Sequence, residues 1–196
     1  MGVGWCAALV VGIGGLLSYE NAPGTVAAVP AAWPESEISR PRDRATLVMV
    51  AHPHCPCTRA SISELAKVMA QVQGSVAAHV LFSTPADAGG DWQDTGLRRS
   101  AAAIPGVSVA TDVDGAEARR FGAETSGHTL LFAADGRLLF SGGITQSRGH
   151  AGDNVGASAI VSLLHNKPAP RASTFVFGCS LPDKPESASG TALAAR

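Results

Sequence analysis

The sequence predicts one α/β domain with a largely parallel sheet, flanked by low-complexity ends. Residues 46–51 form a continuous apolar run rich in β-branched side chains, which is typical of a strand buried on both faces. A helical pattern and a second apolar run follow directly, and together the three segments make a βαβ unit. The chain has 196 residues, of which 45% are apolar and 16% charged, so it is long enough for one such domain and too short for two.

The first helix of the domain has one apolar stripe with the spacing i, i+3, i+4 and i+7, formed by Ile62, Leu65, Ala66 and Met69. Gly74 ends this helix, and residues 75–83 are expected to form the next strand. After a loop over 85–91, a helix is expected over 92–104, weakened at Gly96.

The second half of the domain is predicted to end in a hairpin and a helix. Asp114 is a candidate N-cap for a short helix that extends to residue 121. Asp135-Gly136 predicts a tight hairpin, because both residues tolerate positive φ. The remaining elements are expected as strands over 107–111, 129–133 and 138–140 and a helix over 154–165.

The N-terminal residues 1–19 carry no charged side chain. A helix of this length measures about 28 Å, close to the thickness of the hydrocarbon core of a bilayer. We therefore expect a membrane anchor; a cleaved signal peptide and a soluble apolar terminus are the alternatives. The first two interpretations imply a domain facing the periplasm or exterior at a bacterial inner membrane, or a protein secreted after cleavage.

The flanking segments divide the chain further. Residues 20–44 contain several prolines and no sustained periodicity, which is typical of an extended linker. The domain itself is expected over 45–166, followed by a low-complexity tail over 167–196 in which only residues 174–177 could form a strand. Lys and Arg number 15 against 16 Asp and Glu, and this balance argues against a nucleic-acid partner.

The chemistry is expected at Cys55-Pro56-Cys57, directly after the first strand. Two helical residues at this spacing point roughly 200° apart, so they cannot both be helical and bridged. Pro56 suits the first helical position, which places Cys55 at an exposed N-cap and Cys57 in the turn beneath it. The helix N-terminus favours a thiolate. The short ring of a Cys-Pro-Cys disulfide is easily reduced, which favours an oxidising or isomerising couple.

The element order and this cysteine pair, with proline directly before the second cysteine, resemble the thioredoxin-like fold. The resemblance covers about residues 45–166 and is to the variant with a central helix-strand insertion, found in membrane-tethered periplasmic thiol oxidoreductases and peroxiredoxins. The motif His-Pro-His-Cys-Pro-Cys-Thr-Arg-Ala-Ser is also similar to that of bacterial RedB-type thioredoxin-like proteins.

The resemblance implies a thiol-disulfide oxidoreductase, tethered to the membrane through residues 3–19. Cys55 would be the nucleophile and Cys57 would resolve the mixed disulfide. The partners would be protein or small-molecule thiols and disulfides, together with an upstream electron donor or acceptor, and no cofactor would be required.

Departures from the family pattern identify further candidate residues. Met49 stands where thioredoxins often have a buried acid, so His52 or His54 would have to move protons. His128 occupies the position of the usual proline before the strand that faces the active site, which would place an imidazole close to the thiols. Arg59, one turn into the helix, is a candidate for tuning the thiol pKa or, alternatively, a surface charge.

The glycine-rich loop over 141–156 is either a flexible connection or, by resemblance, a border of the active-site groove. In the second case Arg148 and His150 would contact the substrate. Cys179 is interpreted as a tail thiol of no consequence, the alternative being a third redox partner that reaches back.

A metal-binding protein is the alternative function. Sulfur and imidazole donors suit Cu(I) or Zn(II), and copper-delivery proteins with a thioredoxin-like fold exist. An interaction module with an inactive site is a third hypothesis. The candidate ligands are His52, His54, Cys55, Cys57 and His128.

Overall fold

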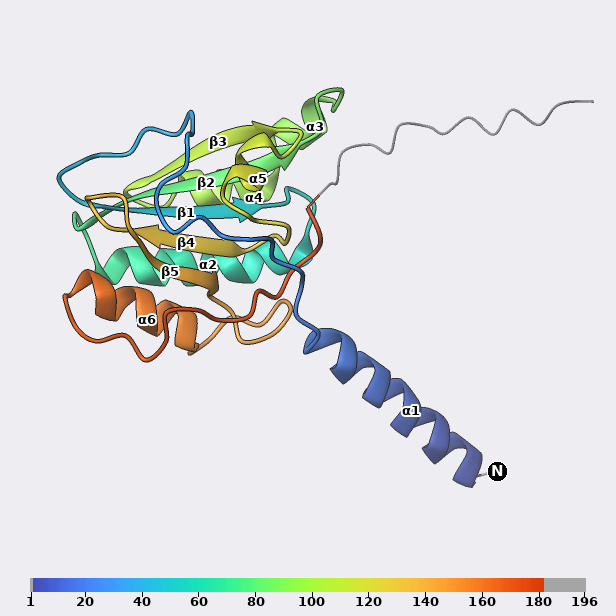
Figure 1. Cartoon of the computed structure of the whole chain (residues 1–196). Helices are drawn as coiled ribbons and strands as arrows, with labels where there is room; N and C mark the ends of the chain where they lie inside the picture. The colour runs from blue at the N-terminus through green and yellow to red at the C-terminus, as the bar shows by residue number, and fades with distance from the viewer. Residues whose placement is uncertain (1, 182–196) are drawn as a thin grey trace, which may run out of the picture.

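The computed structural model describes residues 2–181 (Figure 1). It confirms the predicted α/β fold class. The elements are α1 (Gly2–Glu20), β1 (Ala45–Ala51), α2 (Pro56–Gln71), β2 (Val76–Thr84), α3 (Gly90–Gln93), α4 (Gly96–Ala102), β3 (Val107–Val113), α5 (Ala116–Arg120), β4 (His128–Phe132), β5 (Leu138–Gly143) and α6 (Val155–Leu164).

The five strands form one mixed sheet in the order β3-β2-β1-β4-β5. Strand β1 pairs in parallel with β2, which pairs in parallel with β3, whereas β4 is antiparallel to both β1 and β5. The helices α3 and α4 and the strand β3 are inserted between β2 and α5. This is the thioredoxin-like arrangement with a central helix-strand insertion, as predicted.

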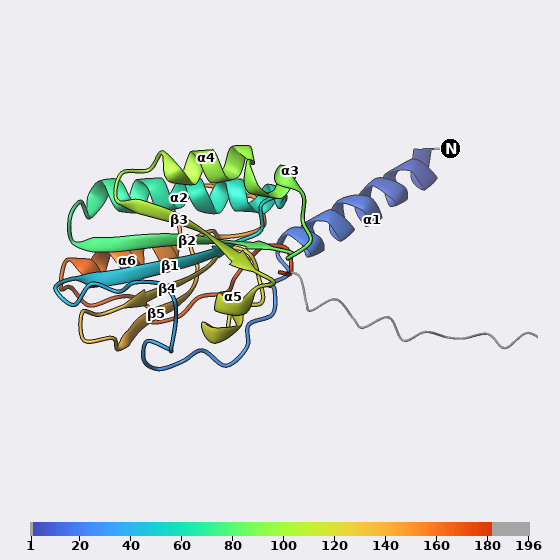
Figure 2. The ribbon, with the colours of Figure 1, turned by 90° about the horizontal axis from the view of Figure 1, so that it is seen from above.

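The two faces of the sheet bury separate apolar clusters. Along β1, Leu47 and Met49 pack with α2, α4 and α6, while Val48 and Val50 pack with α5 on the opposite face. This alternation follows from the two-residue repeat of a strand and explains why β1 is apolar throughout. Figure 2 shows α2 and α4 on one side of the sheet and α5 on the other.

Residues 21–44, which we call the N-terminal segment, contain no helix or named strand and are part of the domain. The segment crosses the face that carries α5 (Figure 2) and makes single bridges from Val26 to Ala123 and from Ala32 to Arg137. Trp33 packs edge-to-face against two core aromatic rings, with centroids 5.2 Å from Phe121 and 5.1 Å from Phe132. Isolated contacts of this kind leave no periodic pattern in the sequence.

The folded part continues past the predicted limit at residue 166. Residues 167–181, which we call the C-terminal strap, lie alongside β5 and the N-terminal segment and form hydrogen bonds with both. The side chains of Val176 and Leu181 are buried. The strap makes one bridge to β5, between Ser141 and Ser173, and does not form the strand considered over 174–177.

Two local predictions are corrected. The helix expected over 92–104 is two short helices, because Thr95 accepts a hydrogen bond from the Arg98 N–H (3.2 Å) and begins α4 anew. The carboxylate at the start of α5 is that of Asp112 and not of Asp114: it accepts hydrogen bonds from the backbone N–H groups of Glu117 (2.8 Å) and Ala118 (2.9 Å). Asp114 instead accepts from the N–H of Ala86 (2.8 Å).

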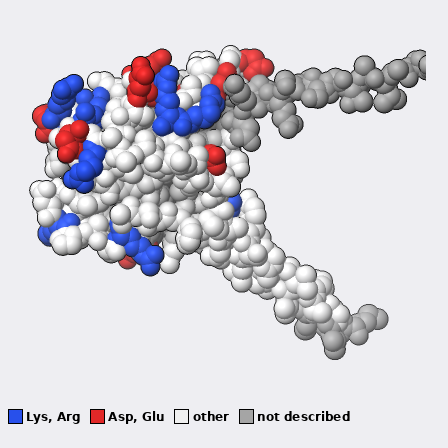
Figure 3. Space-filling model, in the orientation of Figure 1, with Lys and Arg blue, Asp and Glu red and all other residues white. Residues whose placement is uncertain are grey.

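Helix α1 extends away from the domain (Figure 1), and it carries exposed apolar side chains, among them Trp5 and Leu16. Most of it is white in Figure 3, whereas basic and acidic side chains are interspersed over the domain on the same face. Within residues 2–181, no helix combines the length and the apolar character needed to span a membrane. The predicted membrane-spanning anchor is therefore not supported.

Replacing Trp33 by alanine should destabilise the domain, because it removes the edge-to-face contacts with Phe121 and Phe132. We expect the free energy of unfolding to fall by about 3 kcal/mol, measured by urea denaturation. Trp5→Ala is the matched control, since Trp5 is 69% exposed and its removal should leave the midpoint unchanged. Equal midpoints for Trp33→Ala and the unmodified chain would contradict a structural role for the N-terminal segment.

Candidate functional site

The end of β1 leads directly into the cysteine pair. Cys55 is the N-cap of α2, with φ −83° and ψ 119°, and Pro56 is its first helical residue. Proline lacks an N–H group, which that position does not need, and it keeps the preceding residue out of the α region. The predicted placement of Cys55 before the helix and of Cys57 in its first turn is confirmed.

The expected exposure of Cys55 is wrong. Its relative exposure is only 2%, yet it belongs to neither apolar core cluster. The burial comes from the site itself, where Cys179 of the C-terminal strap and Thr58 of α2 contact the thiol. Cys57 and Cys179 are each partly exposed.

Three free thiols meet at this point. The sulfur atoms of Cys55, Cys57 and Cys179 all lie within 4.8 Å of one another. Among the residues that the structure describes, no histidine nitrogen joins this group, so the predicted set of histidine and cysteine ligands does not converge. The sulfur that completes the group comes from the strap.

The environment of Cys55 lowers its thiol pKa. Burial acts in the opposite direction, because it disfavours the thiolate, but hydrogen bonds outweigh it. The hydrogen bonding that lowers the pKa involves Cys179 and Thr58. The N-terminus of α2 adds its partial positive charge. Cys55 is therefore the thiol of the three that is poised to act as a nucleophile.

The pKa values of the two neighbouring thiols shift in the opposite direction. Burial raises the pKa of Cys57, and the negative charge of Cys55 raises it further. Burial, the hydrogen bond that it donates to Cys55 and the nearby thiolate charges raise the pKa of Cys179 to about 12. Arg148 acts against both shifts through its positive charge. The three thiols therefore differ in acidity, with the pKa of Cys55 lowered and those of Cys57 and Cys179 raised.

A small polar network fixes the loop that carries Cys55. The Ser126 hydroxyl oxygen accepts a hydrogen bond from the His52 N–H (2.9 Å) and lies 2.7 Å from the Thr58 hydroxyl. The Thr58 hydroxyl is in turn 3.2 Å from the carbonyl oxygen of His52, to which it donates. The start of α2 is thereby joined to the segment that precedes β4.

The two histidines before Cys55 pack with an aromatic residue from the insertion. The ring centroid of Trp92 lies 5.3 Å from that of His52 and 4.8 Å from that of His54. Burial, followed by repulsion from His54, lowers the pKa of His52. Nδ1 of His52 accepts a hydrogen bond from the His54 N–H (3.1 Å), as a neutral imidazole can. His54 itself is exposed.

His128 and Arg59 do not meet the thiols. His128 is fully buried on the sheet face opposite α2, where its Nε2 lies 2.8 Å from the Ser141 hydroxyl. Burial lowers its pKa to about 4, so the imidazole is neutral. It borders a cavity of about 430 Å³ together with Val26 and Val29 of the N-terminal segment. Arg59 lies exposed on α2.

Arg148 lies near the thiols, whereas His150 lies at the end of α1. A guanidinium N–H of Arg148 donates to the carbonyl oxygen of Gly178, one residue before Cys179. The same guanidinium lies 5.0 Å from the ring centroid of Tyr19. His150 pairs with Glu20, with Nε2 3.6 Å from the carboxylate oxygen.

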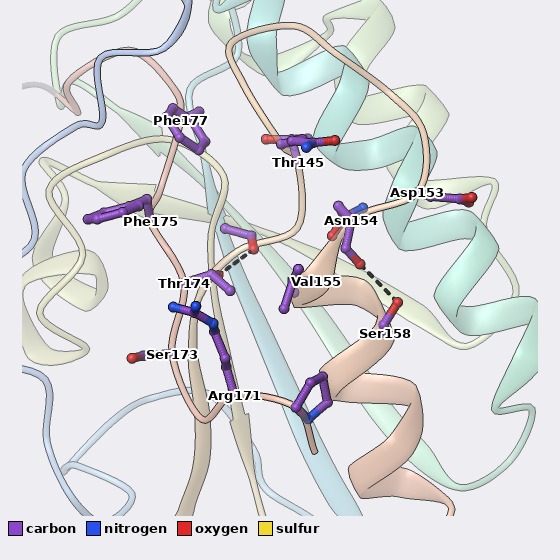
Figure 4. Close-up of a pocket in the computed structure, with 14 residues that line it drawn as sticks. Thr145, Asp153, Asn154, Val155, Ser158, Arg171, Ser173, Thr174, Phe175 and Phe177 are labelled. Atoms are coloured by element: carbon purple, nitrogen blue, oxygen red, sulfur yellow. Dashed lines mark hydrogen bonds between the residues drawn. The ribbon is translucent and has the colours of Figure 1, made fainter.

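A cavity of about 780 Å³ lies between the strap and the start of α6 (Figure 4). Phe175 and Phe177 of the strap border it on one side, and Asn154 and Val155 border it on the other. None of the three cysteines borders it, nor do the predicted groove residues Arg148 and His150. The cavity is therefore separate from the thiol site but close to it along the chain, because Phe177 borders the cavity and lies two residues before Cys179.

Sequence reasoning missed Ser126 and Trp92 and gave Cys179 the less consequential interpretation. The signals were weak: Cys179 follows a Phe-Gly pair in a segment rich in Pro, Ala and Ser, and Trp92 follows a loop. All three residues reach the site through tertiary contacts.

Fold and site together define a thioredoxin-like domain with a dithiol at the start of the helix that follows the first strand. No family model and no curated protein matches the chain. The chain is similar to the crystal structure of a hypothetical protein from Sinorhizobium meliloti 1021, with 19% identity and a TM-score of 0.63 over 82% of this chain and 100% of that one.

An uncharacterized conserved protein from Geobacillus kaustophilus has 21% identity and a TM-score of 0.61, over 85% of this chain and 95% of that one. A thioredoxin-like protein solved in its oxidized form gives a TM-score of 0.48 at 16% identity, over 76% and 97% of the two chains. At these identities the first two matches show the fold alone. The similarity to RedB-type proteins stays a prediction.

The lowered pKa of Cys55 predicts a thiolate that persists below the ordinary thiol value of about 8.5. As the pH falls through the lowered pKa, Cys55 takes up a proton and the nucleophile is lost. Ultraviolet absorbance of the reduced chain should show this step, and Cys55→Ser should remove it. A titration in which every thiolate forms at or above the ordinary value would contradict the hydrogen-bonded thiolate.

Proposed function

We propose that the chain is a thiol-disulfide oxidoreductase in which Cys55 is the nucleophile and Cys57 is the resolving thiol. The observation that carries this proposal is a hydrogen-bonded thiol of lowered pKa at the N-terminus of α2, with a second thiol within 4.8 Å on the first helical turn. The thioredoxin-like fold is consistent with this chemistry, and the site itself supplies the argument.

The reaction balances with two thiols and one partner disulfide. The Cys55 thiolate attacks one sulfur of the partner, forming a mixed disulfide and releasing the other partner sulfur as a thiolate, which takes a proton from solvent. Cys57 then loses its proton and attacks the Cys55 sulfur, which releases the second partner thiolate. The partner gains two electrons and two protons, and the chain gains a disulfide. The reverse sequence donates a disulfide.

The electrostatics of the site favour this order of events. The negative charge on Cys55 is one cause of the raised pKa of Cys57, and that charge disappears when Cys55 enters the mixed disulfide. The positive charge of Arg148, which lowers the pKa of Cys57, is retained. Cys57 therefore becomes easier to deprotonate at the step in which it must attack.

We assign proton exchange with solvent to His54, which is exposed and precedes Cys55, and not to the buried His128. The partners are thiols and disulfides of proteins or small molecules, together with an electron donor or acceptor that resets the pair.

We further propose that the domain works outside the cytosol on the oxidising side of the bacterial inner membrane. The support is the uncharged apolar segment over residues 1–19, whose composition suits export and whose side chains Trp5 and Leu16 are exposed. Cell fractionation, together with the mass of the mature chain, tests this location.

A cysteine metal site is the second candidate function, because three sulfur atoms within 4.8 Å of one another are soft ligands for Cu(I) or Zn(II). The ligands would be Cys55, Cys57 and Cys179 in place of the histidine-containing set.

Equilibration of the reduced chain with glutathione and its disulfide tests the oxidoreductase. We expect an intramolecular disulfide that involves Cys55, and Cys55→Ser should reduce the exchange to background. Cys6→Ser is the control and should exchange like the unmodified chain. Failure of Cys55 to exchange, combined with one tightly bound metal per chain that depends on Cys55, would favour the metal site instead.

A further inference from the structure

The strap holds Cys179 over Cys55 through main-chain hydrogen bonds. Thr125 and Ser180 form an antiparallel bridge, in which the Ser126 N–H donates to the carbonyl of Cys179 (2.9 Å) and the Leu181 N–H donates to the carbonyl of Glu124 (2.8 Å). The segment that bonds to the strap is the one that fixes the Cys55 loop through the Ser126 hydroxyl. Cys179 is therefore placed by the fold.

The residues before Cys179 are held as firmly. The Gly24 N–H donates to the carbonyl of Val176 (2.8 Å), and Arg148 donates to that of Gly178. At Gly178 the backbones approach so closely that a Cβ atom would lie 1.9 Å from the carbonyl oxygen of Ser126. Only glycine permits this approach, which brings the Cys179 sulfur to the other two.

We propose that Cys179 is a third catalytic thiol, which takes over the disulfide from the Cys55-Cys57 pair and links the strap to Cys55. The proposal rests on the oxidoreductase function above and deepens it. The oxidised resting form is then the Cys55-Cys179 disulfide, with Cys57 as a free thiol.

The transfer is an internal exchange with no net oxidation. Cys179 loses its proton and attacks the Cys55 sulfur, the Cys55-Cys57 bond breaks, and Cys57 leaves as a thiolate that takes up the proton. The electrons and protons of the three-thiol group are unchanged. The oxidant is the partner disulfide. It accepts two electrons from the thiols of Cys55 and Cys57, which form their disulfide before the exchange begins.

Ring strain sets the direction of the exchange. A disulfide between Cys55 and Cys57 closes over one intervening residue, and departure from relaxed geometry makes such a bond easier to break. A bond between Cys55 and Cys179 joins separate segments and has no small ring. It requires the two sulfur atoms, now within 4.8 Å, to approach by up to about 3 Å.

The charges favour the same step. Burial is the largest cause of the raised pKa of Cys179, and its hydrogen bond to Cys55 and the charge of Cys55 add to it. Oxidation of Cys55 removes the last two causes and leaves the opposing charge of Arg148 in place. Cys179 thus becomes a better nucleophile when Cys55 is ready to be attacked.

A Cys57→Ser variant of the full chain tests the proposal, in a Cys6→Ser background so that only site thiols can link. Glutathione disulfide is added, the free thiols are blocked in acid, and the linkages are mapped by mass spectrometry. We expect a Cys55-Cys179 disulfide with at most a few per cent of glutathione left on Cys55. Adding Cys179→Ser should convert nearly all of it to the glutathione mixed disulfide.

Diamide joins neighbouring thiols without prior exchange. It therefore separates the pairing of Cys55 with Cys179 from the exchange of Cys55 with glutathione disulfide. A Cys55-glutathione adduct that persists in Cys57→Ser, with no Cys179 linkage by either reagent, would overturn the role of Cys179 and leave the oxidoreductase standing. A Cys55-Cys179 bond with diamide but no reaction with glutathione disulfide would support the pairing and overturn the exchange function.

A glycine variant tests the same placement with all thiols intact. Gly178→Ala should force the strap away from Ser126, so that oxidation yields mainly the Cys55-Cys57 disulfide. Gly96→Ala is the matched control, because no atom lies within 4 Å of the added Cβ, and it should keep the Cys55-Cys179 linkage. Circular dichroism checks that both variants fold. An unchanged linkage in a folded Gly178→Ala chain would contradict the proposed placement.

Discussion

The lowered pKa of the Cys55 thiol depends on hydrogen bonding that offsets its burial. A sulfur anion with 2% exposure would otherwise be disfavoured, because it has lost most of its water. This hydrogen bonding involves Cys179 and Thr58. The strap therefore both removes solvent from Cys55 and supplies Cys179, which helps to compensate for the burial. The reactivity of the cysteine pair depends in this way on a segment more than a hundred residues away in the chain.

The sheet brings these segments together. Strand β1 ends next to the beginning of its antiparallel neighbour β4, and the Gly127 N–H donates to the carbonyl of Val50 across that boundary (2.7 Å). Residues 125–127 contact the Cys55 loop through the Ser126 hydroxyl and pair with the strap through the bridge between Thr125 and Ser180. The turn at this point therefore positions both sulfur-bearing segments. The Ser126 side chain, which is buried, joins the first, and its backbone joins the second.

Elements with a local signal could be predicted from the sequence. The apolar run of β1, the stripe of α2, the Asp135-Gly136 turn and the position of Pro56 each specify structure within a few residues, so the fold class and the cysteine pair follow. His128 shows the limit of such reasoning. Its place at the start of β4 is as predicted, but strand alternation puts it on the face of Leu130 and Phe132, opposite α2.

The role of the strap could not be predicted, because backbone hydrogen bonds hold it and these leave no side-chain pattern. Its composition, rich in Pro, Ala and Ser, is that of a linker in isolation. What sequence could indicate was a third cysteine after a glycine. That the glycine admits a close backbone contact, and thereby brings the sulfur to Cys55, becomes visible only when residues 124–126 are placed beside it.

The pKa values of the three thiols bear on the two chemistries considered for the site, disulfide exchange and metal binding. Negative charge on Cys55 is one cause of the raised pKa of both Cys57 and Cys179. A metal ion bound by all three sulfur atoms would need all three deprotonated and would have to displace two protons from thiols that act as donors here. Disulfide exchange needs one thiolate at a time and moves the charge from sulfur to sulfur. One thiol of lowered pKa beside two thiols of raised pKa therefore suits disulfide exchange, whereas a metal ion would have to remove the protons of the two less acidic thiols.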